Sequence, residues 1–161
     1  MASVYGTEAT KIWNQEPSEP AAVGTLGGGM RLHYDKYTYT ADLSTGDLIL
    51  MNGLLPKGAR IIDAMIKFED LDGAGGTVDF GYAASAEQSG GSTVEAADEN
   101  AFHEAVDVAT AADTIKASDN QANAAGIGKK LSGAVQPQIK IEGDTDTTTG
   151  TIESFIWYVL D

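Results

Sequence analysis

Several residue types on which protein chemistry often depends are absent or scarce in this chain of 161 residues. There is no cysteine, which excludes disulfide bonds, thiolate zinc sites and a cysteine nucleophile. The two histidines, His33 and His103, lie far apart in the sequence, so a histidine metal site is not expected. Ten lysines and arginines stand against 24 acids, and the net charge of −14 argues against a nucleic-acid partner, whose phosphates must be neutralised.

Long apolar segments are missing as well. The chain has no run of roughly 18 apolar residues, no basic N-terminal region followed by an apolar segment, and no lipidation motif. We therefore expect a soluble protein that has no membrane partner and is not exported through the Sec pathway. Val, Ile, Leu, Met, Phe, Trp and Tyr together number 45, which can fill one modest core in a single domain. Val, Ile, Leu and Phe alone make up 33 of the 161 residues, about 20%, close to the composition at which chains stop folding.

Residues 1–29 differ in character from the body that follows at 30–161, and we predict that they form an extended N-terminal arm. Pro17 and Pro20 favour extended backbone, and the glycines at 27–29 supply a flexible joint. Ile12 and Trp13 are the expected apolar anchors of the arm. Two alternatives stay open: the arm packs on its own domain or is disordered, or it docks on a neighbouring subunit.

Six segments carry the two-residue alternation of β-strands or a short apolar run bounded by turn residues. They are Arg31–Thr40, Asp47–Asn52, Ala59–Glu69, Thr77–Ala84, Ala134–Glu142 and Thr151–Leu160. The third and fourth are separated by a glycine-rich loop and are predicted to form a hairpin. Strands joined by glycine-rich turns, without a helix between each pair, predict an all-β protein with an antiparallel β-sandwich or barrel.

Residue patterns also predict how some strands face. In Ala59–Glu69, one face is expected to carry Arg60, Ile62, Ala64, Ile66 and Phe68, and a helix over the same residues is the alternative. Pro137 lacks an amide donor, which predicts that Ala134–Glu142 lies at a sheet edge or contains a bulge. Thr151–Leu160 is apolar on both faces, which predicts a central strand buried on two sides.

One short helix is predicted over Asp98–Val106. Asp98 can cap the first turn, and Glu99 favours the positive end of a helix. Phe102, Ala105 and Val106 would form its apolar stripe.

No catalytic, cofactor-binding or metal-binding residues are predicted. Neither histidine lies in a pattern such as Gly-x-Ser-x-Gly. The carboxylates at Asp70 and Asp72, and at Asp144 and Asp146, are interpreted as solvated turns, since a calcium loop starting at Asp70 would place Gly81 where a glutamate is needed. The glycines between 73 and 76 lack the Lys-Ser/Thr ending of a phosphate-binding loop.

Two surface features remain open to interpretation. Lys129 and Lys130 are the only adjacent bases; they relieve local negative repulsion or meet an acidic partner. Tyr34, Tyr37 and Tyr39 form either a platform for sugar stacking or ordinary cross-strand packing.

The stretch Thr38–Ser85 resembles a type of structural protein found in the virions of tailed bacteriophages. The resemblance follows the order Thr40–Leu43, Gly46-Asp47, Leu48–Met51, Leu55–Arg60, Ile61–Phe68 and Gly81–Ala83. It continues through Gly126–Leu131, Val135–Ile141 and the last apolar strand. These motifs are structural, so no functional residues are carried over from them.

The resemblance implies a non-enzymatic capsid cement or decoration protein on the outer shell of the virion. The expected fold is a jelly-roll-like β-sandwich, and the expected partners are the major capsid protein and further copies of the chain in a homotrimer. Ile12, Trp13, Pro17 and Pro20 are the predicted interaction residues. The alternatives are a phage tail or neck component, a carbohydrate-binding β-sandwich module and a hydrolase using Asp70, Asp72 or His33.

Overall fold

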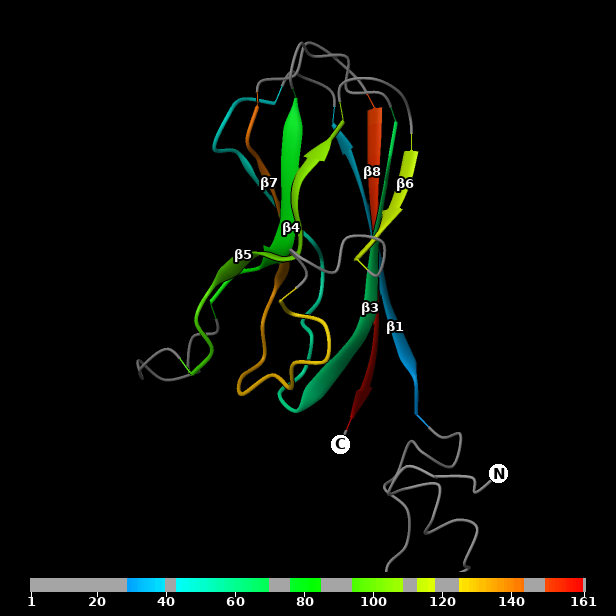
Figure 1. Cartoon of the computed structure of the whole chain (residues 1–161), viewed down its shortest axis with the longest axis vertical. Helices are drawn as coiled ribbons and strands as arrows, with labels where there is room; N and C mark the ends of the chain where they lie inside the picture. Colours follow the sequence, from blue (N-terminus) through cyan, green and yellow to red (C-terminus); the bar gives the residue numbers. More distant parts are fainter. Residues whose placement is uncertain are drawn as a thin grey trace, which may run out of the picture.

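Two four-stranded antiparallel sheets pack face to face in the body of the protein (Figure 1). The computed structural model describes residues 29–39, 43–69, 76–84, 94–108, 113–117, 125–143 and 150–160. The strands are β1 (Arg31–Tyr39), β2 (Leu48–Leu50), β3 (Ala59–Phe68), β4 (Thr77–Tyr82), β5 (Asp98–Asp107), β6 (Asp113–Lys116), β7 (Pro137–Ile141) and β8 (Gly150–Leu160).

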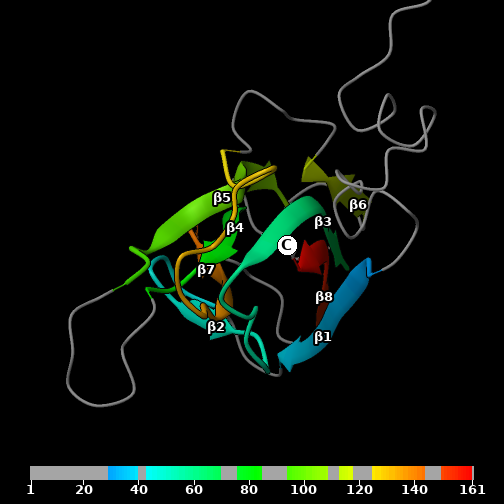
Figure 2. The same cartoon turned by 90° about the horizontal axis from the view of Figure 1, so that it is seen from below.

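The strand order is that of a jelly roll. One sheet has the order β1-β8-β3-β6 and the other β2-β7-β4-β5. Every connection between these strands crosses from one sheet to the other, except the one from β4 to β5. Figure 2 shows β1 and β2 along one side of the sandwich and β5 and β6 along the opposite side. The predicted jelly-roll-like β-sandwich is therefore confirmed.

The predicted hairpin of β3 and β4 is wrong. These strands belong to different sheets, and β3 pairs with β6 and β8. A glycine-rich loop between two strands permits a tight reversal, but it also permits a crossing between sheets. Local turn chemistry cannot distinguish the two.

The core lies between the sheets and is made of the inward-facing aliphatic and aromatic side chains. Phe80, Tyr82 and Phe102 form its aromatic part, with the ring centroid of Phe102 5.0 Å from that of Phe80 and 5.9 Å from that of Tyr82. Ile139 and Ile156 are completely buried on opposite sheets. Burying these groups from both sheets in a single layer supplies the main stabilisation of the sandwich.

A bulge in β3 corrects the predicted grouping of two residues, Arg60 and Ile62. Pairing with β8 shifts between Ile61 and Asp63, so Ile61 points into the core and is fully buried whereas Ile62 is 44% exposed. Beyond the bulge, Ala64, Ile66 and Phe68 share one face, as predicted, and that face is the inward one. The extra residue shifts the phase of the alternation, and strict period-two counting therefore misplaces Ile62.

The helix predicted over Asp98–Val106 is wrong, because these residues form β5. Phe102 and Val106 are buried against the core as strand residues, and Val106 lies opposite Val78 of β4. A nine-residue helix with one apolar stripe is marginal by itself, whereas pairing with β4 supplies backbone partners at intervals from Asp98 to Asp107. The described residues contain no α-helix.

Two features of β4 and β5 accommodate the irregular pairing between them. Gly81 is required because a Cβ there would overlap the carbonyl oxygen of Asp98. Further along, Ala105 has a positive φ of 51° and donates its amide hydrogen to Asp79 Oδ1 over 2.8 Å. The carboxylate of Asp79 therefore satisfies a backbone donor where the ladder is interrupted.

Pro137 does not place its strand at an edge. β7 lies between β2 and β4, which makes it central, and no shift in register is found along its pairing. Pro137 is the first residue of the strand, where its carbonyl still accepts a hydrogen bond from Met51 N at 2.9 Å. The first position of a strand is the other place where a missing amide donor is tolerated.

The last strand is central, as predicted. β8 pairs with β1 on one side and with β3 on the other, which ties the end of the chain into the fold. Its inner face is fully buried through Ile152, Ser154 and Ile156. Its outer face is only half-buried. Burial of β8 on both faces, which the sequence predicts, is therefore not reached within the described part of the chain.

Candidate interaction surfaces

The predicted interaction residues Ile12, Trp13, Pro17 and Pro20 lie outside the described residues. The described chain begins at Gly29, and β1 starts with Arg31 opposite Tyr158 of β8. The N-terminal segment therefore joins the body at the same end at which β8 finishes. Its role as an arm stays a prediction.

Apolar side chains cover part of the outer face of the sheet β1-β8-β3-β6. We call this surface the aromatic face; its residues are Leu32, Tyr34, Met65, Phe155 and Trp157. Leu32 lies opposite Trp157, and Phe155 lies between Tyr34 and Met65 in the register of the sheet. The rings of Tyr34 and Phe155 are 4.9 Å apart, and those of Phe155 and Trp157 are stacked at 6.2 Å. Leu32 is 51% exposed and Tyr34 49% exposed.

One carboxylate, Glu153, lies next to the aromatic face and is fully engaged. Its Oε1 is 3.2 Å from Lys67 Nζ, and its Oε2 accepts a hydrogen bond from the hydroxyl of Tyr34 at 3.1 Å. Desolvation would raise the pKa of Glu153, but these two donors outweigh it and hold the pKa below its ordinary value. Desolvation and the bond to Glu153 both raise the pKa of Tyr34.

The outer face of the other sheet is acidic. Its described acids are Asp79, Glu99, Glu104, Asp107 and Glu142. Lys140 Nζ lies 2.8 Å from both Glu99 Oε2 and Glu142 Oε1, and these hydrogen bonds raise the pKa of Lys140. Burial is the main cause of a raised pKa at Asp79, with Glu142 and Glu104 adding repulsion. The two outer faces therefore differ in sign of charge as well as in polarity.

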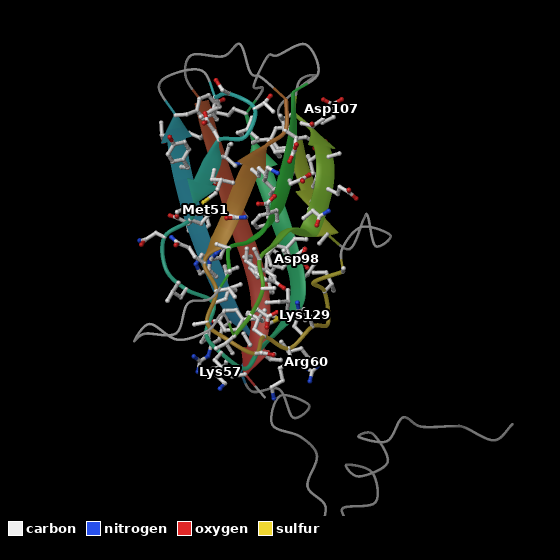
Figure 3. All side chains as sticks on the ribbon, turned by 90° about the vertical axis from the view of Figure 1, so that its left-hand side faces the viewer. Met51, Lys57, Arg60, Asp98, Asp107 and Lys129 are labelled. Atoms are coloured by element: carbon white, nitrogen blue, oxygen red, sulfur yellow. The ribbon has the colours of Figure 1, made fainter. Side chains whose placement is uncertain are left out.

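The two ends of the sandwich also differ in charge. Five of the nine bases among the described residues lie at the end where β1 begins and β8 finishes; this basic end comprises Arg31, Lys57, Arg60, Lys129 and Lys130. At the opposite end, the described residues at and next to the strand ends include five acids: Asp47, Glu69, Asp107, Asp113 and Glu142. Figure 3 shows Lys57, Arg60 and Lys129 near one end and Asp107 toward the other.

Lys129 holds two loops together at the basic end. Its Nζ lies 2.8 Å from Glu95 Oε1 and donates to Tyr82 Oη at 2.7 Å. The second oxygen of Glu95 accepts the amide hydrogen of Ser132 at 2.7 Å. Bonds to Glu95 and Tyr82 raise the pKa of Lys129 above its usual range. Lys130, its neighbour in sequence, is exposed.

The two histidines take part in hydrogen bonding and core packing. His33 Nε2 lies 2.9 Å from the carbonyl oxygen of Asn52 and donates to it, which links β1 to the residues after β2. His103 is completely buried in β5 opposite Phe80, and not on a helix as predicted. Among the described residues, no group of three or more His, Asp or Glu side chains is arranged to hold a metal ion. Asp70, Asp72, Asp144 and Asp146 lie outside them.

The three tyrosines do not form one platform. Tyr39 is buried, and Tyr34 and Tyr37 point to opposite faces of β1 because they are an odd number of residues apart. Tyr34 instead packs on Phe155.

A membrane-spanning helix is not found in the part of the chain that the structure describes.

Comparison with known proteins gives similarities in three-dimensional structure. No family model matches the chain, and no curated protein matches it. A chain of the structure titled "Cyanophage Pam1 capsid asymmetric unit" superposes with a TM-score of 0.63 at 19% identity, over 90% of this chain and 95% of that one. This chain shares its fold with chains of bacteriophage capsid structures. A second example, from "Capsid of Ralstonia phage GP4", has a TM-score of 0.59 at 22% identity and covers 84% and 88% of the two chains.

Neither the aromatic face nor the difference in charge between the two ends was predicted from the sequence. The signal for the face is present: Leu32 and Tyr34 share one side of β1, and β8 is apolar on both sides. The charge difference between the ends could not be predicted from the sequence, because it depends on which loops the topology brings to the same end of the sandwich.

Proposed function

We propose that the chain is a non-enzymatic virion structural protein, a cement or decoration protein that binds the outer surface of a phage head and stabilises its shell. The observation that carries the proposal is the similarity in fold to phage capsid chains, which extends over nearly the whole of both partners. The sequence resemblance over Thr38–Ser85 points to the same class of protein.

The charge distribution supports a docking orientation in which the basic end faces the major capsid protein. The predicted arm enters the body at that end, so Ile12 and Trp13 would reach the same partner, with Pro17 and Pro20 keeping the segment extended. The acidic end then faces solvent, where like charge keeps particles apart. Binding as a homotrimer at symmetric lattice positions multiplies modest contacts into tight attachment.

The proposal is tested by adding the purified protein to phage heads that lack it. We expect saturable binding at symmetric positions, seen by electron cryomicroscopy of the particles, and greater resistance of the heads to heat. Deleting residues 2–29 should leave the body folded and weaken binding. Heads that take up none of the full-length protein would refute the role, and unchanged binding after the deletion would remove the arm from it.

The docking orientation has its own test. Replacing Lys57 and Lys130 by alanine should weaken binding to heads roughly tenfold, since two favourable charge contacts are lost. The matched control replaces Lys36 and Lys116, which are also exposed and bring the chain to the same net charge. Equal losses in the two variants would show that overall charge, and not the basic end, determines binding.

A further inference from the structure

The aromatic face is too apolar for a surface that stays in water. Tyr34, Phe155 and Trp157 lie side by side across β1 and β8, and the inner side of β8 already belongs to the core. A strand that is apolar on both sides is typical of sheets covered on both faces. Leu32 and Tyr34 are exposed and Met65, Phe155 and Trp157 are partly exposed, and contiguous accessible apolar groups of this kind mark interaction sites.

We propose that the aromatic face is the surface through which one copy of this chain packs against another. The inference is independent of the homotrimer of the proposed function, because a face that packs against the same face of a second copy relates two copies by a twofold axis. The contact itself is tested without phage heads.

Charge favours a second copy as the occupant. In a molecule of net charge −14, two copies repel one another over most of their surfaces. The outer side of the sheet that carries the aromatic face is an exception. The register places four bases and two acids there, a net charge of +2; they are Lys36, Arg60, Lys67, Lys116, Asp63 and Glu153. The outer side of the other sheet has one base and five acids among the described residues, a net charge of −4. Of the two contacts between like faces, the one through the aromatic face (+2 against +2) therefore carries less repulsion than the one through the acidic face (−4 against −4).

The chemistry of the face suits burial in an interface. Tyr34, Phe155 and Trp157 are already held by stacking on one another, so little side-chain freedom is lost when they are covered. Two acids border the face: both oxygens of Glu153 are bonded, to Lys67 and Tyr34, and Asp63, which lies opposite Trp157, accepts the amide hydrogen of Ala64 through Oδ1. Covering the face thus leaves no unpaired carboxylate, which would be costly.

The experiment compares Leu32→Glu with Leu48→Glu in the full-length protein. Both leucines are 51% exposed and lie on the edge strands β1 and β2, but only Leu32 belongs to the aromatic face. Molar mass is measured by sedimentation over a range of protein concentrations, and folding is checked by circular dichroism. We expect a multimer for the wild type and for Leu48→Glu, and an increase of at least about tenfold in the dissociation constant for Leu32→Glu.

Three results would overturn the inference. The first is a wild type that stays monomeric up to about 100 μM, since weaker association lies outside ordinary specific interfaces. The second is equal association of the two variants. The third is a monomeric wild type whose binding to heads is lost in Leu32→Glu. The last would assign the face to the shell protein. A multimeric wild type that fails to bind heads, with Leu32→Glu dissociated, would support the inference and refute the proposed function.

Discussion

At the scale of single residues, Glu95 shows how one buried acid fixes loops that no strand holds. It is 7% exposed and joins Lys129 to the amide of Ser132, so it connects the segment before β5 to the segment before β7. Its pKa is lowered: desolvation acts to raise it, but the bonds from Lys129 and Ser132 are stronger in sum.

Glu95→Gln should reduce the free energy of unfolding by about 1–3 kcal/mol at pH 7, because a buried charge-assisted network is broken. A lowered pKa in the folded state means that this contribution is full above the ordinary value of 4.5 and disappears as pH falls through the lower folded value. The difference between wild type and variant, measured by urea unfolding, should therefore shrink on acidification below that value.

Glu69→Gln serves as the matched control for this measurement. Glu69 is exposed at the opposite end of the sandwich, and its removal should change stability by less than about 0.5 kcal/mol at either pH. A Glu95 effect that does not depend on pH would contradict the assignment of its charge to the network with Lys129.

At the scale of secondary-structure elements, the bulge in β3 decides which of two adjacent isoleucines holds the sheets together. Ile61 is fully buried and Ile62 is 44% exposed, although the sequence pattern placed Ile62, and not Ile61, on the same face as the buried Ala64, Ile66 and Phe68. The bulge adds one residue between the positions paired with Tyr158 and Trp157, and every inward residue after it is displaced by one.

The two isoleucines therefore respond differently to truncation. Ile61→Ala should cost about 2–5 kcal/mol of unfolding free energy, because it removes buried methyl groups and leaves a cavity. Ile62→Ala should cost less than about 1 kcal/mol, since solvent replaces the lost side chain. Chemical denaturation of both variants measures the difference, and a larger loss for Ile62 would mean that the register of β3 is not as described.

At the scale of the whole molecule, charge is distributed by topology. Acids of the described residues, among them Asp47, Glu69 and Glu142, meet at one end because successive strands run in opposite directions between the two ends. Lysines and arginines gather at the other end, around the start of β1 and the end of β8. Because of this difference in charge, the basic end can bind an acidic partner, while the acidic end repels other acidic surfaces.

Repulsion among the clustered acids should make thermal stability depend on salt. Raising the ionic strength from about 0.01 M to about 0.15 M shortens the screening length from roughly 30 Å to roughly 8 Å. The melting temperature, followed by circular dichroism, is expected to rise by about 2–5 °C because self-repulsion in the folded state is relieved. Sodium chloride and potassium chloride at equal ionic strength should act alike; a fall in melting temperature would show that favourable ion pairs, and not repulsion, dominate.

The sequence by itself determined where most strands lie and that the protein is all-β. Alternation in Thr77–Ala84 and the two-sided apolar pattern of Thr151–Leu160 report the local geometry of a strand, and that geometry depends only on neighbouring residues. The facing of Val78, Phe80 and Tyr82 and the central place of β8 follow from it.

Only the tertiary structure decided which strands are partners. The same local sequence at Asp98–Val106 is compatible with a short helix, and pairing with β4 made it a strand. The separation of β3 and β4 into two sheets, the bulge at Ile62 and the gathering of acids at one end all depend on contacts between segments distant in the chain. Periodicity is a local property and contains no information about those contacts.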